Sequence, residues 1–508
     1  METLGGREPG ELAYHYLAGM TADTTARAIH HARAAGQRAL AISAPNEAVR
    51  WYSAALNALP PPRDDLEHAR LQLDLGIAQR QAADPNYRET LLSTARTAQH
   101  TGADDLLVEA AIAVNPGGFS SLGQVDTEKV AVLESALTVV GSNTTKRARL
   151  LAALSGELTW HPDHRRRIEL ADEAVAVARS SGDSGALFDA IMRPAVATWV
   201  PQTSARRARL FREAVDLADR AHDPMARNQA VGLLAPTLLE QGVADRFEDA
   251  LDAAAKVAMD IREPLLQWVT LLPRWCLTIV RGDLDLAEAQ GAEILQLDSV
   301  GAREGHAEVL GIIRWHQGRL SEALPGLRTA LARLRGVPTR WAGLAFAEAI
   351  GGDREQAKVM LAQAATNNFD LPYGPAWLGS MCQWAAVAAE LGDTGAATTL
   401  YSRLSPWKDL FGTSGPMPVH GVSHALERLA ALLGQPDTAE RHFTRAWRIH
   451  QTMRAPFYTA ETGLCWGQML IPSNPDRART LLTQAVELAR THGFGDVERR
   501  TLQTLAAA

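Results

Sequence analysis

The sequence predicts an all-α protein built from stacked helical hairpins. Three observations favour this class: a glycine–alanine pattern that recurs every 34 to 42 residues, a near absence of strand-like alternation, and a length of 508 residues. A single hydrophobic core stops growing beyond roughly 250–300 residues, so a chain of this length either splits into domains or extends as a repeat array. The regular spacing favours the array.

The repeated pattern describes how a hairpin packs. Glycine can take the left-handed conformation that ends a first helix, and small side chains on one face let the second helix lie close to it. The sequence therefore predicts a solenoid of helical hairpins that forms a right-handed superhelix. Glycine, alanine, a large apolar residue and a second small residue follow each other in these copies: Gly318, Ala323, Leu327, Ala330; Gly352, Ala357, Leu361, Ala364; Gly434, Ala439, Phe443, Ala446; and, more loosely, Gly392, Ala397, Tyr401, Leu404; Gly282, Ala287, Ile294; and Ala478, Leu482, Ala485.

Three segments rich in proline or glycine interrupt the helical pattern. They are Pro60–Pro62, Asn115–Gly123 and Phe411–Pro418. A proline run cannot continue a helix, and long connections within a regular array are often functional. We expect an N-terminal helical group over residues 1–60, irregular repeats over 61–262 and more regular repeats over 263–508.

The order of these segments resembles a known family. The Ala, Tyr/Phe, Ala positions are those of the tetratricopeptide (TPR) consensus. The segments Glu11–Gly19, His31–Leu40, Glu47–Leu56 and Leu433–Phe443 are similar to the TPR-like region that follows a STAND-type (AAA-like) ATPase module in large actinobacterial regulators. The resemblance implies a sensor and partner-binding arm, with the ATPase upstream and a LuxR-type DNA-binding domain, a nucleotide cyclase or an activation domain as output.

The chain departs from that family in its chemical motifs. It contains no G-x-x-x-x-G-K-[ST] phosphate loop; the nearest segment, Gly141–Lys146, lacks the second glycine and the hydroxyl residue and is expected to cap a helix that begins near Thr145. Its C-terminus has no helix-turn-helix, and a net charge of −7 provides no basic field for nucleic acid. We therefore expect no cofactor and no direct binding of nucleic acid.

The location of the protein is predicted from what the sequence lacks. There is no signal-peptide core and no apolar stretch of about 18 residues, so no membrane association is expected. The three cysteines, Cys276, Cys382 and Cys465, lie far apart and fit reduced thiols. These features favour a cytoplasmic protein. The oligomeric state stays open, with a homo-oligomer as one option.

The candidate catalytic and metal-binding motifs in the sequence are all incomplete. His420 and His424 have the i, i+4 spacing of a helical metal pair, but no glutamate follows His420 and no third ligand is near in sequence, so no metal is expected. Asp163 is expected to cap a helix whose first turn carries the solvated arginines Arg165–Arg167. No nucleophile elbow or cysteine-protease motif is present, and the chain is predicted not to be an enzyme.

Aromatic residues indicate where a ligand would bind. Nine of the twelve tryptophans fall between Trp268 and Trp466. Most are expected to fill the core between hairpins, yet the rings near the least regular loops can contact a ligand on the concave face. The predicted binding residues are Tyr373, Trp377, Trp407, Phe411, His420 and His424. The competing interpretation is that these side chains fill gaps where the repeats are distorted.

These observations favour a non-catalytic TPR-like sensor or scaffold arm for signal transduction or transcriptional regulation, which binds a protein segment or a small effector. One alternative is a fragment of a multidomain ATPase or nucleotide-cyclase regulator whose catalytic domain is absent from this chain. A second alternative is a stand-alone assembly scaffold without a small ligand.

Overall fold

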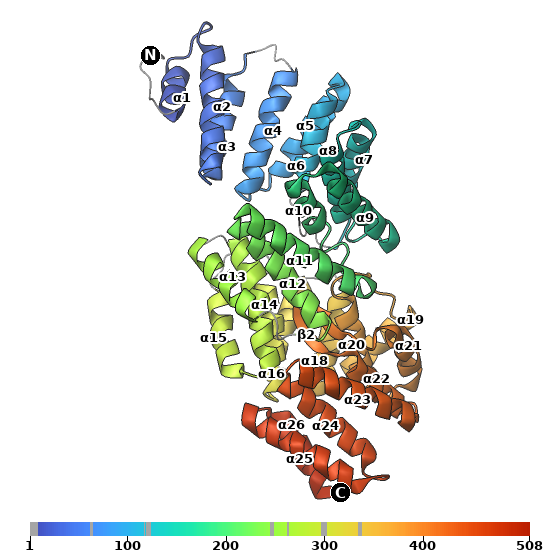
Figure 1. Ribbon diagram of the computed structural model, residues 1–508. Helices are drawn as coiled ribbons and strands as arrows, with labels where there is room; N and C mark the ends of the chain where they lie inside the picture. The colour runs from blue at the N-terminus through green and yellow to red at the C-terminus, as the bar shows by residue number, and fades with distance from the viewer. Residues whose placement is uncertain are drawn as a thin grey trace. The chain divides into compact units, whose positions relative to one another are not determined.

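The computed structural model describes residues 9–60, 65–115, 117, 123–243, 248–261, 264–295, 302–333 and 338–507. In these residues the chain forms 26 α-helices, three short 3-10 helices and one two-stranded hairpin (Figure 1). The predicted all-α, TPR-like class is therefore confirmed. The chain divides into two compact units, unit 1 (Met1–Ala197) and unit 2 (Thr198–Ala508).

Unit 1 consists of consecutive helices, each packed against the next along the chain. Their bounds are α1 Pro9–Ala18, α2 Thr25–Ala41, α3 Pro45–Ala58, α4 Asp65–Gln81, α5 Tyr87–Thr101, α6 Asp104–Val114, α7 Thr127–Val139, α8 Thr144–Glu157, α9 His164–Ser181 and α10 Ser184–Met192.

Unit 2 contains the regular repeats and the hairpin. Its elements are η1 Pro201–Thr203, α11 Ser204–Ala221, α12 Pro224–Glu240, α13 Glu248–Ile261, α14 Pro264–Arg281, α15 Leu284–Ile294, α16 Ala302–His316, α17 Leu320–Arg333, η2 Pro338–Arg340, α18 Trp341–Gly351, α19 Arg354–Thr366, α20 Trp377–Leu391, α21 Thr394–Leu404, η3 Ser405–Trp407, β1 Phe411–Ser414, β2 Met417–Gly421, α22 Val422–Leu432, α23 Pro436–Thr452, α24 Pro456–Leu470, α25 Pro475–His492 and α26 Gly495–Ala507.

The repeat register predicted from the sequence is correct. The first alanine of every copy is buried, and Ala439 and Ala478 are 0% and 1% exposed. Gly318 and Gly434 follow their helices with φ of +75° and +70°, in the left-handed region that favours glycine. The second helix of each hairpin therefore begins directly after a tight turn and packs its small-residue face on the first.

Gly352 fits the pattern for a different reason. Its φ is −135°, so the left-handed conformation does not explain it. A Cβ atom there would clash with the Glu348 carboxylate and lie 2.8 Å from a methyl carbon of Leu324. A larger residue at this position would therefore displace the side chains of Glu348 and Leu324.

The unit boundary differs from the expected boundaries at residues 60 and 262. Tyr52 of α3 and Ala78 of α4 share one apolar cluster, and Arg33 pairs with Asp74 at 2.6 Å, so packing continues across the proline-rich segment. Helices α13 and α14 likewise pack together across residue 262. Residues 61, 62, 116, 118–122 and 262, which belong to segments discussed above, lie outside the described residues.

Two predicted helix caps are confirmed, and one expectation is corrected. The side chain of Asn143 accepts a hydrogen bond from the Lys146 N–H at the start of α8, and Asp163 accepts one from the Arg166 N–H at the start of α9. Arg167, expected to be solvated, is 2% exposed and donates a hydrogen bond to the Thr159 carbonyl after α8. It therefore satisfies a backbone acceptor at the end of that helix.

The third interrupting segment forms an antiparallel β-hairpin. Phe411 pairs with Gly421 and Ser414 with Met417, and the register shifts at Gly412 and Thr413. Gly415, with a φ of +61°, and Pro416 form the turn. The sequence predicted a loop here because four or five residues are too few for a clear strand pattern.

Alanine-to-glutamate substitutions test the packing register. We expect Ala439→Glu and Ala478→Glu each to lower the unfolding free energy by about 3–5 kcal/mol, because a carboxylate would be buried without a partner. Thr480→Glu, two residues from Ala478 but exposed, is the matched control and should change stability by less than about 0.5 kcal/mol. Thermal and urea unfolding measure both. Parent-like melting of the two alanine variants would contradict the register.

Candidate functional site

Strand β2 of the hairpin formed by residues 411–421 lies among the helices of unit 2 (Figure 1). Strand β1 packs on α12 and α20, and β2 packs on α14, α20, α22 and α23. Phe411 is fully buried in an apolar cluster with Leu239 of α12, Val280 of α14 and Tyr458 of α24. The hairpin therefore joins repeats that are far apart in the sequence.

Close backbone contacts hold the hairpin in place. A Cβ atom on Gly379 of α20 would lie 2.7 Å from the carbonyl of Thr413, and one on Gly412 would lie 2.8 Å from Cys382 Sγ. The Gly415 N–H donates a hydrogen bond of 2.9 Å to the Pro375 carbonyl. The surface under the hairpin is thus shaped to accept an extended backbone.

The six residues predicted to bind a ligand fall into two groups. Trp377, Phe411, His420 and His424 are buried, whereas Tyr373 and Trp407 are half-buried at the edge of the α18–α22 core. The structure brings Tyr373 and Trp377 into edge-to-face contact at 4.9 Å, and His420 and His424 to 5.2 Å between ring centroids. Only Tyr373 and Trp407 of this set expose part of their surface.

The two predicted histidines belong to a larger buried cluster. His424 Nδ1 lies 2.6 Å from Glu427 Oε1 and 3.2 Å from Thr462 Oγ1, and His450 Nδ1 lies 3.1 Å from the same hydroxyl. Burial lowers the pKa of His420 to about 4 and that of His450 to about 3. Burial also raises the pKa of Glu427, so this carboxyl favours its neutral form beside His424.

The i, i+4 spacing of His420 and His424 does not reflect one shared helix. His420 lies on β2 and His424 on α22, so the pair does not share one helix. His450 and Thr462, which come from α23 and α24, could not be associated with them by any local pattern. Within the described residues, no group of three or more His, Cys, Asp or Glu side chains could hold a metal ion.

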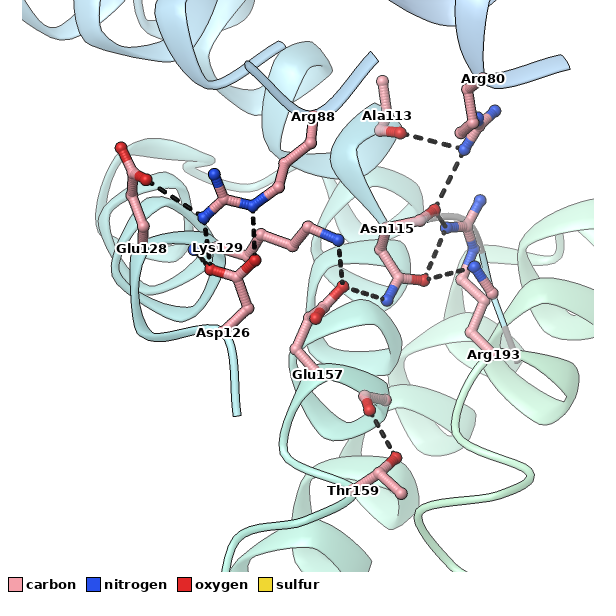
Figure 2. A network of polar contacts seen from close by, with 12 residues as sticks. Arg80, Arg88, Ala113, Asn115, Asp126, Glu128, Lys129, Glu157, Thr159 and Arg193 are labelled. Carbon is pink, nitrogen blue, oxygen red and sulfur yellow. Dashed lines mark hydrogen bonds and ion pairs between the residues drawn. The ribbon is translucent and has the colours of Figure 1, made fainter. Parts of the chain in front are cut away.

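Unit 1 contains a separate buried polar network (Figure 2). Arg80 of α4 and Arg193, which follows α10, both donate hydrogen bonds to the carbonyl of Asn115, at 3.0 and 3.1 Å. Arg80 also donates to the carbonyl of Ala113. The two arginines thus satisfy carbonyl groups at the C-terminus of α6, where positive charge is favoured. Burial, followed by the charge of Arg193, lowers the pKa of Arg80.

The other half of this network is an ion pair. The Asn115 side-chain amide donates to Glu157 Oε1 at 2.8 Å, and Lys129 Nζ lies 3.7 Å from the same oxygen. Lys129 and Glu157 are each 1% exposed. Nearby, Arg88 forms hydrogen bonds with Asp126 and Glu128 (Figure 2). Because these contacts join groups from different helices, the network connects α4, α6, α7, α8 and the residue that follows α10.

Comparisons with known proteins add little beyond this geometry. The sequence matches no protein-family model and no curated protein. Among solved structures, the chain is similar to one in the crystal structure of the APC/C hetero-tetramer Cut9–Hcn1, with 14% sequence identity and a TM-score of 0.39. That alignment covers 97% of this chain and 98% of the other. No helix in the described residues is long and apolar enough to cross a membrane.

Replacing Lys129 tests the buried ion pair. We expect Lys129→Met to lower the unfolding free energy of unit 1 by about 3–5 kcal/mol, because the Glu157 carboxylate would lose its buried cation. Glu157→Gln on that background should restore part of the loss, which a double-mutant cycle measures. The control is Lys146→Met, whose partners Asp105 and Glu109 are exposed, and its cost should stay below about 1 kcal/mol. Equal costs for the two lysines would contradict the assignment.

The buried histidines predict that stability depends on pH. Burial lowers the pKa of His316 to about 3, and that of His420 to about 4, below the value of about 6.5 expected in the unfolded chain. Between these values the unfolded chain binds more protons, so the unfolding free energy should be full above about pH 7 and fall as the pH drops toward 4. Urea unfolding at several pH values measures this dependence.

The variant His316→Phe isolates the contribution of one buried histidine to this pH dependence. Both ring nitrogens of His316 lack a hydrogen-bond partner among the described residues, and the ring stacks on Phe457 at 3.6 Å. Phenylalanine keeps the stacking and removes one proton-binding difference, so the variant should lose less stability between pH 7 and 5 than the parent. His100→Gln, at an exposed position of α5, should leave the pH dependence unchanged. A parent-like pH dependence of the His316 variant would refute this explanation.

Proposed function

We propose that the chain is a non-catalytic interaction arm that binds a segment of a partner protein on the inner face of unit 2. The observation that supports this function is the hairpin of residues 411–421, which packs on α12, α14, α20 and α22; we call the surface of these helices under the hairpin the inner face. Glycines at 379 and 412 allow the backbone of the hairpin to approach closely. A surface that holds an extended segment of its own chain can hold a similar segment of another protein.

The partner segment, in this proposal, replaces the hairpin or contacts the half-buried rings beside it. Tyr373 and Trp407 present part of their surface at the edge of the same core. Aromatic side chains at such positions contribute contact area at a low cost in rotamer entropy. The resemblance to the repeat region of multidomain regulators favours a role in signal transduction or transcriptional regulation.

A synthetic peptide provides a defined ligand for the test. In the tested variant, residues 411–421 are replaced by a glycine–serine linker of equal length, and a peptide of residues 409–422 is added. We expect saturable binding by calorimetry, because the peptide restores the contacts of Phe411 with the apolar cluster. Alanine at the Phe411 position of the peptide should weaken binding by at least about tenfold. Alanine at the half-buried Ser414 position is the control and should change the affinity little.

A second measurement covers the case in which the linker variant does not fold. In the intact chain, Gly379→Val places a side chain against Thr413, so hydrogen exchange at residues 411–421 should accelerate more than in the flanking helices. Absence of peptide binding by a folded linker variant would refute the proposed groove. The proposal would also be refuted if the amide hydrogens of residues 411–421 exchanged only when the whole of unit 2 unfolds.

A further inference from the structure

An open cavity of about 500 Å³ lies between the end of α21 with η3 and the first half of α23. All of its lining residues belong to the described part of the chain. Three of them, Lys408, Arg441 and Arg445, are cationic, and the others carry hydroxyl groups or an imidazole. We call this cavity the α21–α23 pocket. None of its lining side chains belongs to the hairpin of residues 411–421. A ligand of the pocket is therefore a separate proposal from the partner segment proposed above.

The charges around the pocket are unbalanced. Arg445 Nε forms an ion pair of 2.8 Å with Asp409, whose side chain is 65% exposed. Lys408 and Arg441 have no ion-pair partner among the residues that the structure describes, and no carboxylate lines the cavity. Arg441 instead donates a hydrogen bond of 3.0 Å to Thr438 Oγ1. Two positive charges therefore face the pocket without compensation.

Tyr401 and His442, which both line the pocket, contact each other and leave one hydrogen-bond donor over. Tyr401 Oη and His442 Nε2 lie 3.0 Å apart, and His442 Nδ1 is buried without a partner. A neutral imidazole and a phenol together carry two hydrogens that can be donated, and their mutual bond uses only one. In either tautomer the second hydrogen, on Nδ1 or on the phenol, is left over. When the hydrogen left over is on the Tyr401 phenol, a ligand in the pocket can accept it, whereas the buried Nδ1 atom of His442 is not accessible to one.

The positive charges at the pocket also act on the imidazole of His442. Burial and the charges of Arg445, Arg441 and Lys408 lower the pKa of His442 to about 4. At neutral pH the ring is therefore uncharged and acts as a hydrogen-bond donor or acceptor. The cationic groups that attract an anion are the lysine and the two arginines.

We propose that the α21–α23 pocket binds a phosphate group, either as inorganic phosphate or as a phosphate monoester. A phosphate dianion matches two uncompensated positive charges, whereas a carboxylate or a halide carries one. Its oxygens can accept the forked hydrogen bonds of Arg441, the ammonium of Lys408 and the hydroxyl of Thr438. The volume exceeds that of one phosphate group, which leaves room for the group to which a monoester phosphate is attached.

Calorimetric titration of the full chain with inorganic phosphate and with O-phosphoserine tests the proposal. Saturable binding is expected for at least one of them, weakened at higher ionic strength because the contacts are partly exposed. Tighter binding of phosphoserine identifies a monoester site, and equal binding identifies a site for the free ion. Lys408→Gln and Arg441→Gln should each weaken binding by about tenfold, since each removes a charge-assisted hydrogen bond.

The matched control is Arg448→Gln, which removes an exposed arginine from the same helix α23 but outside the pocket. It should leave the affinity unchanged. Each of these results would overturn the proposal: no saturable binding of either ligand, binding that survives both pocket substitutions, or binding that falls equally in the Arg448 variant. The side chains of Lys408 and Arg441 are partly or fully exposed, so their replacement should not disturb the fold. The circular dichroism spectra of both variants should therefore match that of the parent.

Discussion

The structure depends on how closely consecutive helices can approach each other. A solenoid has no central core, so each hairpin must bury its apolar face on its neighbours. Small residues make this possible: a Cβ atom at Gly291 would lie 2.6 Å from the Trp275 ring, and one at Gly36 would lie 2.7 Å from the Tyr52 ring. Each such position pairs a missing side chain on one helix with a large ring on the adjacent helix. The alanine register around Ala439 and Ala478 extends the same arrangement through the C-terminal repeats.

Where the repeats are irregular, contacts between polar side chains hold neighbouring helices together in addition to the packing of small residues. Helix α6 ends at an Asn-Pro-Gly-Gly segment, and its last carbonyls accept hydrogen bonds from Arg80 of α4 and from Arg193, which follows α10. At the start of unit 2, Arg207 and Glu240 form a buried pair at 2.7 Å, and Trp199 donates a hydrogen bond to the same carboxylate. These contacts have a defined geometry, so they orient helices where the small-residue pattern is weak. Removing one partner is correspondingly costly, because the other is left buried and unpaired.

Local features of the fold could be predicted from the sequence, and long-range ones could not. The helical class, the alanine register and the caps at Asn143 and Asp163 follow from spacings of a few residues. The position of the hairpin depends on Leu239 and Val280, which lie more than 100 residues before Phe411. The α21–α23 pocket combines Lys408 with Arg441, and the sequence gives no sign that these two side chains share a cavity. Of the four predicted site residues that are buried, Phe411 and His420 are buried because the hairpin packs against the helices of unit 2. Trp377 and His424 lie on α20 and α22 and are buried between helices.

The inward position of the hairpin has a consequence for how the two proposed sites would select ligands. A partner that enters the inner face of unit 2 must first release Phe411, and exposing a buried phenylalanine costs about 1.5–3 kcal/mol. The groove would therefore accept only segments whose own apolar side chains replace that contact. The α21–α23 pocket is open, its lysine and arginines already face the cavity, and no apolar side chain has to leave it. A phosphate-bearing ligand would bind there without opening the hairpin. A ligand of one site therefore need not occupy the other, whereas a partner that carries both a phosphate group and an extended apolar segment would occupy both.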